Sequence, residues 1–174
     1  LFDGVRILTV GRLSKEKGQE LTINVLARLK NEGYKVRWYC IGDGPEKDNY
    51  RNRIKSLDIE NDYILLGSKL NPYPFMKDCD IYVQPSKHEG YCITLGEARC
   101  FDNPIVTTNF TGANEQIKNE ITGLVCDISE QGIYQAIKRL LDNKELYKDI
   151  RTNLSNEIVD STNEINKLGK LVNS

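Results

Sequence analysis

The residues best suited to chemistry lie in the segment 85–98, PSKHEGYCITLGEA. Glu89 and Glu97 are eight positions apart, and Gly90 between them permits an unusual backbone angle. The backbone amides of Tyr91 to Thr94 are expected to converge at the start of a helix, which favours an anion. Carboxylates on both sides of such amides suit the hydroxyls of a sugar and a ribose. Either glutamate alone would indicate a surface residue, but together with the loop they indicate a binding site.

A second candidate loop is GRLSKEKG at residues 11–18, which contains Arg12 and Lys17. The planar guanidinium of Arg12 can grip phosphate oxygens, and the ammonium of Lys17 adds a movable point charge. Two such cations around a glycine-containing loop could bracket one diphosphate. A solvated turn with a basic helix start explains the same residues equally well, so this loop alone does not decide between the two interpretations.

Two other features point to different functions and are weaker. Gly42-Asp43-Gly44 resembles the start of a dinucleotide fingerprint, but Lys47 stands where the third glycine belongs, so a dinucleotide-binding oxidoreductase domain is the less favoured alternative. A non-catalytic interaction or nucleotide-binding module is another alternative, and it leaves the Glu89–Glu97 loop unexplained. The single histidine, His88, has no zinc-like spacing to other ligands, so no metal site is expected.

Short β-rich segments alternate with longer helical patterns, which predicts parallel strands joined by crossover helices. Six strands are expected, at residues 5–10, 36–41, 63–66, 81–83, 104–107 and 123–126. Helices are expected at 18–30, 47–57 and 94–101, with at most one turn at 71–77, and then from Ser129 nearly to the end. The tail at 163–174 is expected to pack on a partner domain. Residues 1–174 thus form one α/β domain with a doubly wound, Rossmann-like parallel sheet, whose ligands bind beyond the carboxyl ends of the strands.

Composition narrows the function classes. The 174 residues carry 24 Lys and Arg against 25 Asp and Glu, a net charge of -1, which gives no support for nucleic-acid binding. No apolar run approaches the roughly 20 residues that span a bilayer, and the N-terminus does not read as a signal peptide. The five cysteines are odd in number and lack CxxC spacing, so free thiols in a reducing cytoplasm are expected.

Taken in order, these segments resemble the C-terminal domain of retaining glycosyltransferases of family GT4, which have the GT-B architecture. The spacing of Glu89 and Glu97 matches the family's EX7E signature, although Tyr91, Cys92 and Thr94 depart from its usual loop sequence. Each further motif is weak alone, but their order along the chain is specific. They are Gly11-Arg12 with Lys17-Gly18, Ile41 to Pro45, Leu66-Gly67 with Asn71 to Pro74, Asp80 to Ser86, Pro104 to Thr108, Gly112 to Glu115 and Gly123 to Val125.

The resemblance implies a role for each matching residue. Arg12 and Lys17 would hold the donor diphosphate, together with the loop of Tyr91, Cys92, Ile93 and Thr94. Glu97 would bind the ribose hydroxyls, and Glu89, the candidate catalytic residue, would contact the transferred sugar. Backbone near Lys69 and Leu70 would lie against the base.

The resemblance also implies partners and location. The donor would be a nucleotide-diphosphate sugar, with a UDP-sugar as the expected choice, and no metal or other cofactor would be needed. The acceptor, a glycan or lipid-linked molecule of surface polysaccharide or oligosaccharide biosynthesis, would be bound by an N-terminal domain absent from this chain. The isolated domain is therefore expected to be inactive. A cytoplasmic location is implied, with peripheral association at the inner face of the membrane in the full-length protein.

Overall fold

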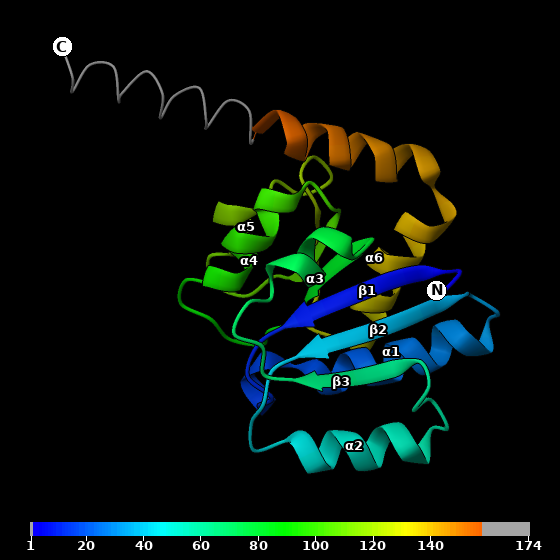
Figure 1. Ribbon diagram of the computed structural model, residues 1–174. Coiled ribbons are helices and arrows are strands. Elements are labelled where there is room, and N and C mark those ends of the chain that lie inside the picture. The colour runs from blue at the N-terminus through cyan, green and yellow to red at the C-terminus, as the bar shows by residue number, and fades with distance from the viewer. Residues whose placement is uncertain (1, 158–174) are drawn as a thin grey trace.

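The computed structural model describes residues 2–157, which fold around a six-stranded parallel sheet (Figure 1). The order across the sheet is β3-β2-β1-β4-β5-β6, and every neighbouring pair is parallel. The strands are β1 (Val5–Val10), β2 (Val36–Ile41), β3 (Tyr63–Gly67), β4 (Ile81–Gln84), β5 (Ile105–Thr108) and β6 (Leu124–Cys126). The predicted doubly wound α/β fold is confirmed, and each strand begins and ends within one residue of the expected position.

Helices cover both faces of the sheet. Three longer helices, α1 (Gln19–Asn31), α2 (Lys47–Ser56) and α6 (Glu130–Asp142), pack on one face. Three shorter ones, α3 (Tyr73–Asp78), α4 (Ile93–Ala98) and α5 (Ala113–Gln116), pack on the other. Successive strand side chains point to opposite faces, so Ile7 belongs to the first core cluster and Leu8 to the second.

Three helical predictions need correction. The segment after β3 forms more than one turn, because Pro72 is the N-cap of α3 and Pro74 lies in its first turn, where no intrahelical N–H is required. The short helix α5 and the 3-10 turn η1 (Lys15–Lys17) were not expected at all. The helix after Ser129 is interrupted at Asn143 and resumes over residues 144–157. The tail predicted at 163–174 lies outside the described residues.

The strand order reverses between β1 and β4, which divides the sheet into two halves. Strands β1, β2 and β3 form one half, and β4, β5 and β6 form the other. β1 and β4 pair in register only at Ile7 with Ile81 and Leu8 with Tyr82. In open α/β sheets such a reversal opens a crevice at the carboxyl ends of the two strands. The loops that follow β1 and β4 are therefore the two that meet at this point.

Candidate functional site

The loop after β1 is built by close backbone approach. A Cβ added to Gly42, at the end of β2, would lie 1.9 Å from the carbonyl oxygen of Gly11, so only glycine fits there. Leu13 N donates to the carbonyl of Asp43 at 3.0 Å, and Gln19 Nε2 donates to the carbonyl of Arg12 at 2.9 Å. The loop conformation is thus fixed through its backbone, while the Arg12 side chain is exposed to solvent.

The positive charge of Arg12 affects a carboxylate in its own loop, that of Glu16. The pKa of Glu16 is lowered by bonds from its own backbone amide and the Ser14 hydroxyl, and further by the nearby charges of Arg12 and Lys15. Among residues 2–157, no hydrogen bond or ion pair engages the Arg12 guanidinium. A cation held at the sheet edge by its backbone, with its donors turned to solvent, is suited to an anionic ligand.

Lys17 and Glu89 meet across the two halves of the sheet. Lys17 ends η1 and is followed by Gly18, whose φ of 69° and whose contact with the Pro85 carbonyl, 2.1 Å from an added Cβ, both require glycine. The ammonium of Lys17 lies 2.5 Å from Glu89 Oε1, and the two side chains are only 27% and 10% exposed. Two residues that the sequence linked to different parts of one ligand therefore contact each other directly.

Glu89 is also held by buried polar side chains at and just after the end of β4. Ser86 Oγ donates to Glu89 Oε1 at 2.7 Å, and Gln84 Nε2 donates to Ser86 Oγ at 2.9 Å. Gln84 and Ser86 are 1% and 0% exposed. Sequence reasoning missed Gln84, although a glutamine that ends a fully buried strand is an unusual polar residue in a core position.

The loop of Tyr91 to Thr94 leads into α4, whose N-cap is Cys92. Among the described residues, no acceptor is bonded to the four amides of residues 91–94. Cys92 has an ordinary backbone conformation (φ -86°, ψ 94°) and is 2% exposed. The expected unusual angle at Gly90 is wrong, because Gly90 is not among the glycines with positive φ. Open space around Gly90 and the free amides leave this loop accessible to a ligand.

Glu97 lies on α4 and is held by a residue that sequence reasoning assigned no role. Tyr73 OH, from the exposed start of α3, donates to Glu97 Oε1 at 2.9 Å. This bond, together with the carboxylate charge, raises the pKa of Tyr73. The contact joins residues 24 positions apart, so no local pattern could have revealed it.

The predicted base contacts lie at the same edge of the sheet. Lys69 and Leu70 lie just after β3, and both are exposed. The end of β3 is tied to β2, because Gly42 N donates to the Gly67 carbonyl at 3.0 Å. Asp43, in the loop after β2, accepts bonds from Gly44 N and Lys47 Nζ. These contacts place Asp43 in a structural turn between β2 and α2.

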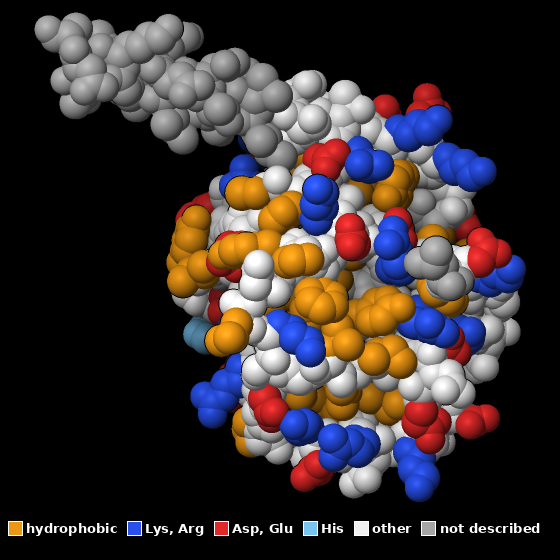
Figure 2. Space-filling view, viewed as in Figure 1, with side chains coloured by type: hydrophobic (Ala, Val, Ile, Leu, Met, Phe, Trp, Pro, Cys, Tyr) orange, Lys and Arg blue, Asp and Glu red, His pale blue; other side chains and the backbone are white. Residues whose placement is uncertain are grey.

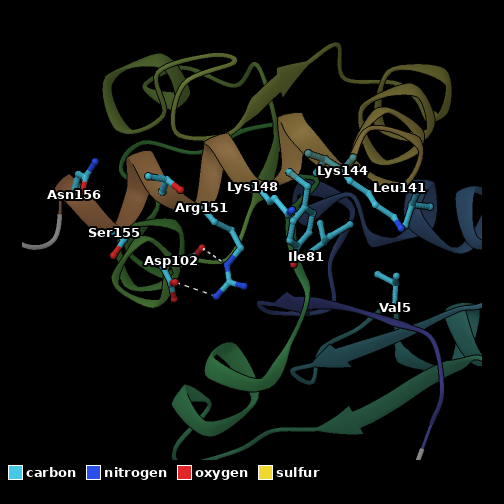
Figure 3. Close-up of a pocket in the computed structure, with 12 residues that line it drawn as sticks. Val5, Ile81, Asp102, Leu141, Lys144, Lys148, Arg151, Ser155 and Asn156 are labelled. Carbon is cyan, nitrogen blue, oxygen red and sulfur yellow. Dashed lines mark hydrogen bonds and ion pairs between the residues drawn. The ribbon is translucent and has the colours of Figure 1, made fainter.

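Two hollows with apolar walls lie away from this edge. One, of about 760 Å³, lies where β1 and β4 begin, beneath the helix at 144–157. Figure 3 shows Lys144, Lys148 and Arg151 along that helix, and Arg151 is paired with Asp102 at 3.0 Å. The other, of about 350 Å³, is lined by Leu8, Tyr39, Leu66 and Phe75 among others. Figure 2 shows hydrophobic side chains gathered on this face, ringed by charged ones.

Comparison with known proteins identifies the family. The family model described as "Glycosyl transferases group 1" matches residues 3–156. The chain belongs to this glycosyltransferase family. The resemblance found in the sequence is thus confirmed at the family level, and the oxidoreductase alternative is set aside.

The curated relatives are longer glycosyltransferases. The chain is 33% identical over 144 residues to an enzyme of Campylobacter jejuni named N-acetylgalactosamine-N,N'-diacetylbacillosaminyl-diphospho-undecaprenol 4-alpha-N-acetylgalactosaminyltransferase, covering 82% of this chain and 39% of the relative. It is 29% identical to the capsular polysaccharide biosynthesis glycosyltransferase CapM of Staphylococcus aureus, covering 88% of this chain and 41% of CapM. The chain therefore spans about two fifths of the length of these relatives.

A solved structure shares the fold. The crystal structure of HepE from Anabaena, determined in complex with UDP, superimposes with a TM-score of 0.82 at 22% identity. The match covers 97% of this chain and 49% of HepE. The six-stranded glycosyltransferase fold expected from the sequence is thus confirmed. Among residues 2–157, no helix has the length and apolar character required to cross a membrane.

Proposed function

We propose that the chain is the donor-binding domain of a retaining glycosyltransferase and binds a nucleotide-diphosphate sugar. The observation that carries this proposal is the meeting of the Arg12–Lys17 loop with the Glu89–Thr94 loop where strand order reverses. Lys17 contacts Glu89 across this junction, and we infer that Arg12 and the amides of residues 91–94 face the same crevice, which would suit a diphosphate. Charge that builds on the leaving nucleotide diphosphate would be stabilised by groups already in place before reaction.

Each predicted residue has a place in this proposal. Arg12 and Lys17 bind the diphosphate with the amides of Tyr91, Cys92, Ile93 and Thr94. Glu97, supported by Tyr73, accepts bonds from the ribose hydroxyls, and backbone near Lys69 and Leu70 lies against the base. Glu89 faces the transferred sugar. We propose a UDP-sugar as the donor, in keeping with the UDP complex of HepE, and a reaction without metal or other cofactor.

The acceptor, and the domain that binds it, are also part of the proposal. The named relatives act on a diphospho-undecaprenol-linked sugar or in capsular polysaccharide synthesis. We propose a glycan or lipid-linked acceptor of the same kind, bound by an N-terminal domain that would close over the donor. Reaction in the cytoplasm at the inner membrane face would follow. Because glycosyl transfer requires both substrates in a closed, water-poor cleft, this chain alone should bind donor weakly and transfer nothing.

Thermal-shift and calorimetric titration with UDP and GDP test the donor site. Ligand that binds only the folded state raises the melting temperature in proportion to RT ln(1 + [L]/Kd). We expect one of the two nucleotides to stabilise the chain, and Arg12→Ala to weaken its binding at least about tenfold, because a charge-assisted contact to phosphate is lost. Arg51→Ala, which removes an exposed arginine of α2 paired only with Asp48, is the matched control. Lack of stabilisation by either nucleotide contradicts the proposal.

The inactivity of the isolated domain needs a separate assay. The chain is incubated with UDP-sugars and a panel of lipid-linked acceptors, and both transferred sugar and released UDP are measured. We expect neither product above the protein-free rate. Turnover by this chain alone would show that the acceptor domain is dispensable.

A further inference from the structure

Gln84 is a buried polar side chain at the carboxyl end of β4, directly before the loop that carries Glu89. Both ends of its carboxamide are engaged. Nε2 donates to Ser86 Oγ at 2.9 Å, while Oε1 accepts from Tyr82 OH at 2.9 Å and from Thr94 Oγ1 at 3.3 Å. Burying an amide is unfavourable unless its bonds are made, so these contacts are the physical reason for a glutamine here.

The hydrogen bonds have one direction, which ends on a carboxylate. Tyr82 donates to Gln84, Gln84 donates to Ser86, and Ser86 donates to Glu89. With the amide reversed, Gln84 would take the Ser86 proton for its own oxygen, and Glu89 would lose that donor. Bonds that share a direction strengthen one another, and those to an ionised acceptor are the strongest. This series of hydrogen bonds therefore helps to fix the position of the Glu89 carboxylate.

A second branch of the same amide reaches the other side of the site. Thr94 lies in the first turn of α4, and its hydroxyl donates to Gln84 Oε1. Glu89 and Thr94 are five positions apart in sequence, and both are connected to Gln84, Glu89 through Ser86 and Thr94 directly. Gln84 thus links the carboxylate to the start of α4.

We propose that Gln84 is a positioning residue that aligns Glu89, through Ser86, with the first turn of α4, through Thr94, for contact with the donor sugar. The inference rests on the proposed function and deepens it, because it explains how Glu89, the proposed sugar contact, is held in place. The two cations proposed for the diphosphate, Arg12 and Lys17, follow the other half of the sheet and are not bonded to Gln84. A change at Gln84 should therefore weaken recognition of the sugar more than recognition of the nucleotide.

The test compares binding of UDP with binding of UDP-glucose, UDP-N-acetylglucosamine and UDP-N-acetylgalactosamine by calorimetry. For the sugar nucleotide that binds best, we expect Gln84→Met to lower its affinity relative to UDP by about five- to tenfold, as loss of a buried hydrogen bond implies. Affinity for UDP itself should fall less than affinity for the sugar nucleotide, because Arg12 and Lys17 are unchanged. Ser86→Ala, a smaller change that removes only the Glu89 branch, should act in the same way and keeps the test valid if Gln84→Met does not fold.

Thr107→Val is the matched control, because it removes a buried hydroxyl whose hydrogen-bond partners among residues 2–157 are the backbone carbonyls of Gln84 and Thr108. It should leave both affinities within about twofold. In a Glu89→Gln background, Ser86→Ala should have no further effect on the ratio, since it acts through Glu89. Equal loss of UDP and UDP-sugar binding, or an unchanged ratio, would overturn the inference. The inference would also be overturned if the wild-type chain bound UDP but bound none of the UDP-sugars more tightly than UDP. Failure to bind any nucleotide would instead overturn the proposed function itself.

Discussion

The ammonium of Lys17 has two candidate partners, the Glu89 carboxylate that it contacts and the diphosphate that we propose it binds. The Lys17 ammonium lies 2.5 Å from the Glu89 carboxylate, and the pair is largely shielded from solvent. A lysine is a compact, movable charge on a flexible stem. Binding of a diphosphate would therefore require Lys17 to share or exchange its partner, and this requirement has a measurable effect.

Glu89→Gln should strengthen binding of UDP by about three- to tenfold, because Lys17 no longer has to leave an ionised partner. The same change should abolish any added affinity for a UDP-sugar, since Glu89 is the proposed sugar contact. Calorimetric titration with both ligands measures the two effects. Glu20→Gln, which breaks the neighbouring pair with Lys87, serves as control. Weaker UDP binding by Glu89→Gln would contradict the exchange.

The five thiols are free and differ sharply in environment. Burial raises the pKa of Cys40, Cys79 and Cys126 to about 12 and also raises the pKa of Cys92, whereas Cys100 is exposed. At pH 8 the four shielded thiols remain protonated and unreactive. We expect a thiol reagent to label one cysteine rapidly in the native chain and all five after unfolding. Cys100→Ser should remove the rapid reaction, and rapid labelling that persists in this variant would refute the assignment.

At the scale of elements, the site depends on two loops that approach each other through glycine. Gly18 joins η1 to α1 and lies against the backbone of Pro85, which begins the loop after β4. Gly33, after α1, has a similar positive φ of 86° but has no atom within 4 Å of an added Cβ. Gly90 has neither constraint. Comparing these three glycines therefore distinguishes the cost of a positive φ from the cost of a steric clash.

Alanine substitution should therefore lower the free energy of unfolding in the order Gly18, Gly33, Gly90. We expect a loss of about 2–4 kcal/mol for Gly18→Ala, from positive φ and clash together. Gly33→Ala should lose about 1 kcal/mol from positive φ alone, and Gly90→Ala less than about 0.5 kcal/mol. Urea denaturation measures all three. A Gly18→Ala chain as stable as Gly90→Ala would exclude the tight contact with Pro85.

Alternation and periodicity in the sequence were sufficient to predict the strands and the long helices. The runs at Val5–Val10 and Val36–Ile41 carry buried, β-branched or aromatic residues, and Leu21, Val25 and Leu29 mark one face of α1. Short elements such as α5 contain too few residues for a period to show. The partnership of Tyr73 with Glu97 and the buried bonds of Gln84 were also unpredictable, because they join segments whose proximity arises only from tertiary packing.

At the scale of the whole molecule, the core shields ionisable groups that are neutral at physiological pH. Besides the thiols, burial raises the pKa of Tyr50, Tyr63 and Tyr82. For each group the folded chain holds its proton more tightly than the unfolded chain does. Stability is then fully present below the unfolded pKa and is lost as pH rises toward the folded one.

The free energy of unfolding should therefore fall steeply between pH 9 and pH 12, the interval between the ordinary and the raised thiol pKa of Cys40. Cys40 alone should contribute a loss of about 2 kcal/mol between pH 8 and 10.5, from 1.36 kcal/mol per pH unit above 9. Urea denaturation of the wild type and Cys40→Val at the two pH values measures this. An equal pH dependence in both proteins would contradict the burial of the thiol.

The brief pairing of β1 with β4 has a further consequence. A bound diphosphate sugar would contact Arg12 and Lys17 on one side and the Glu89 loop on the other. It would therefore connect the two halves of the sheet, which are paired at only two positions between β1 and β4. Main-chain protons of β4 should then exchange with deuterated solvent more slowly in the complex, although the ligand touches none of them. A ligand bound in the crevice at the carboxyl ends of the strands would thus reduce opening motions throughout the sheet.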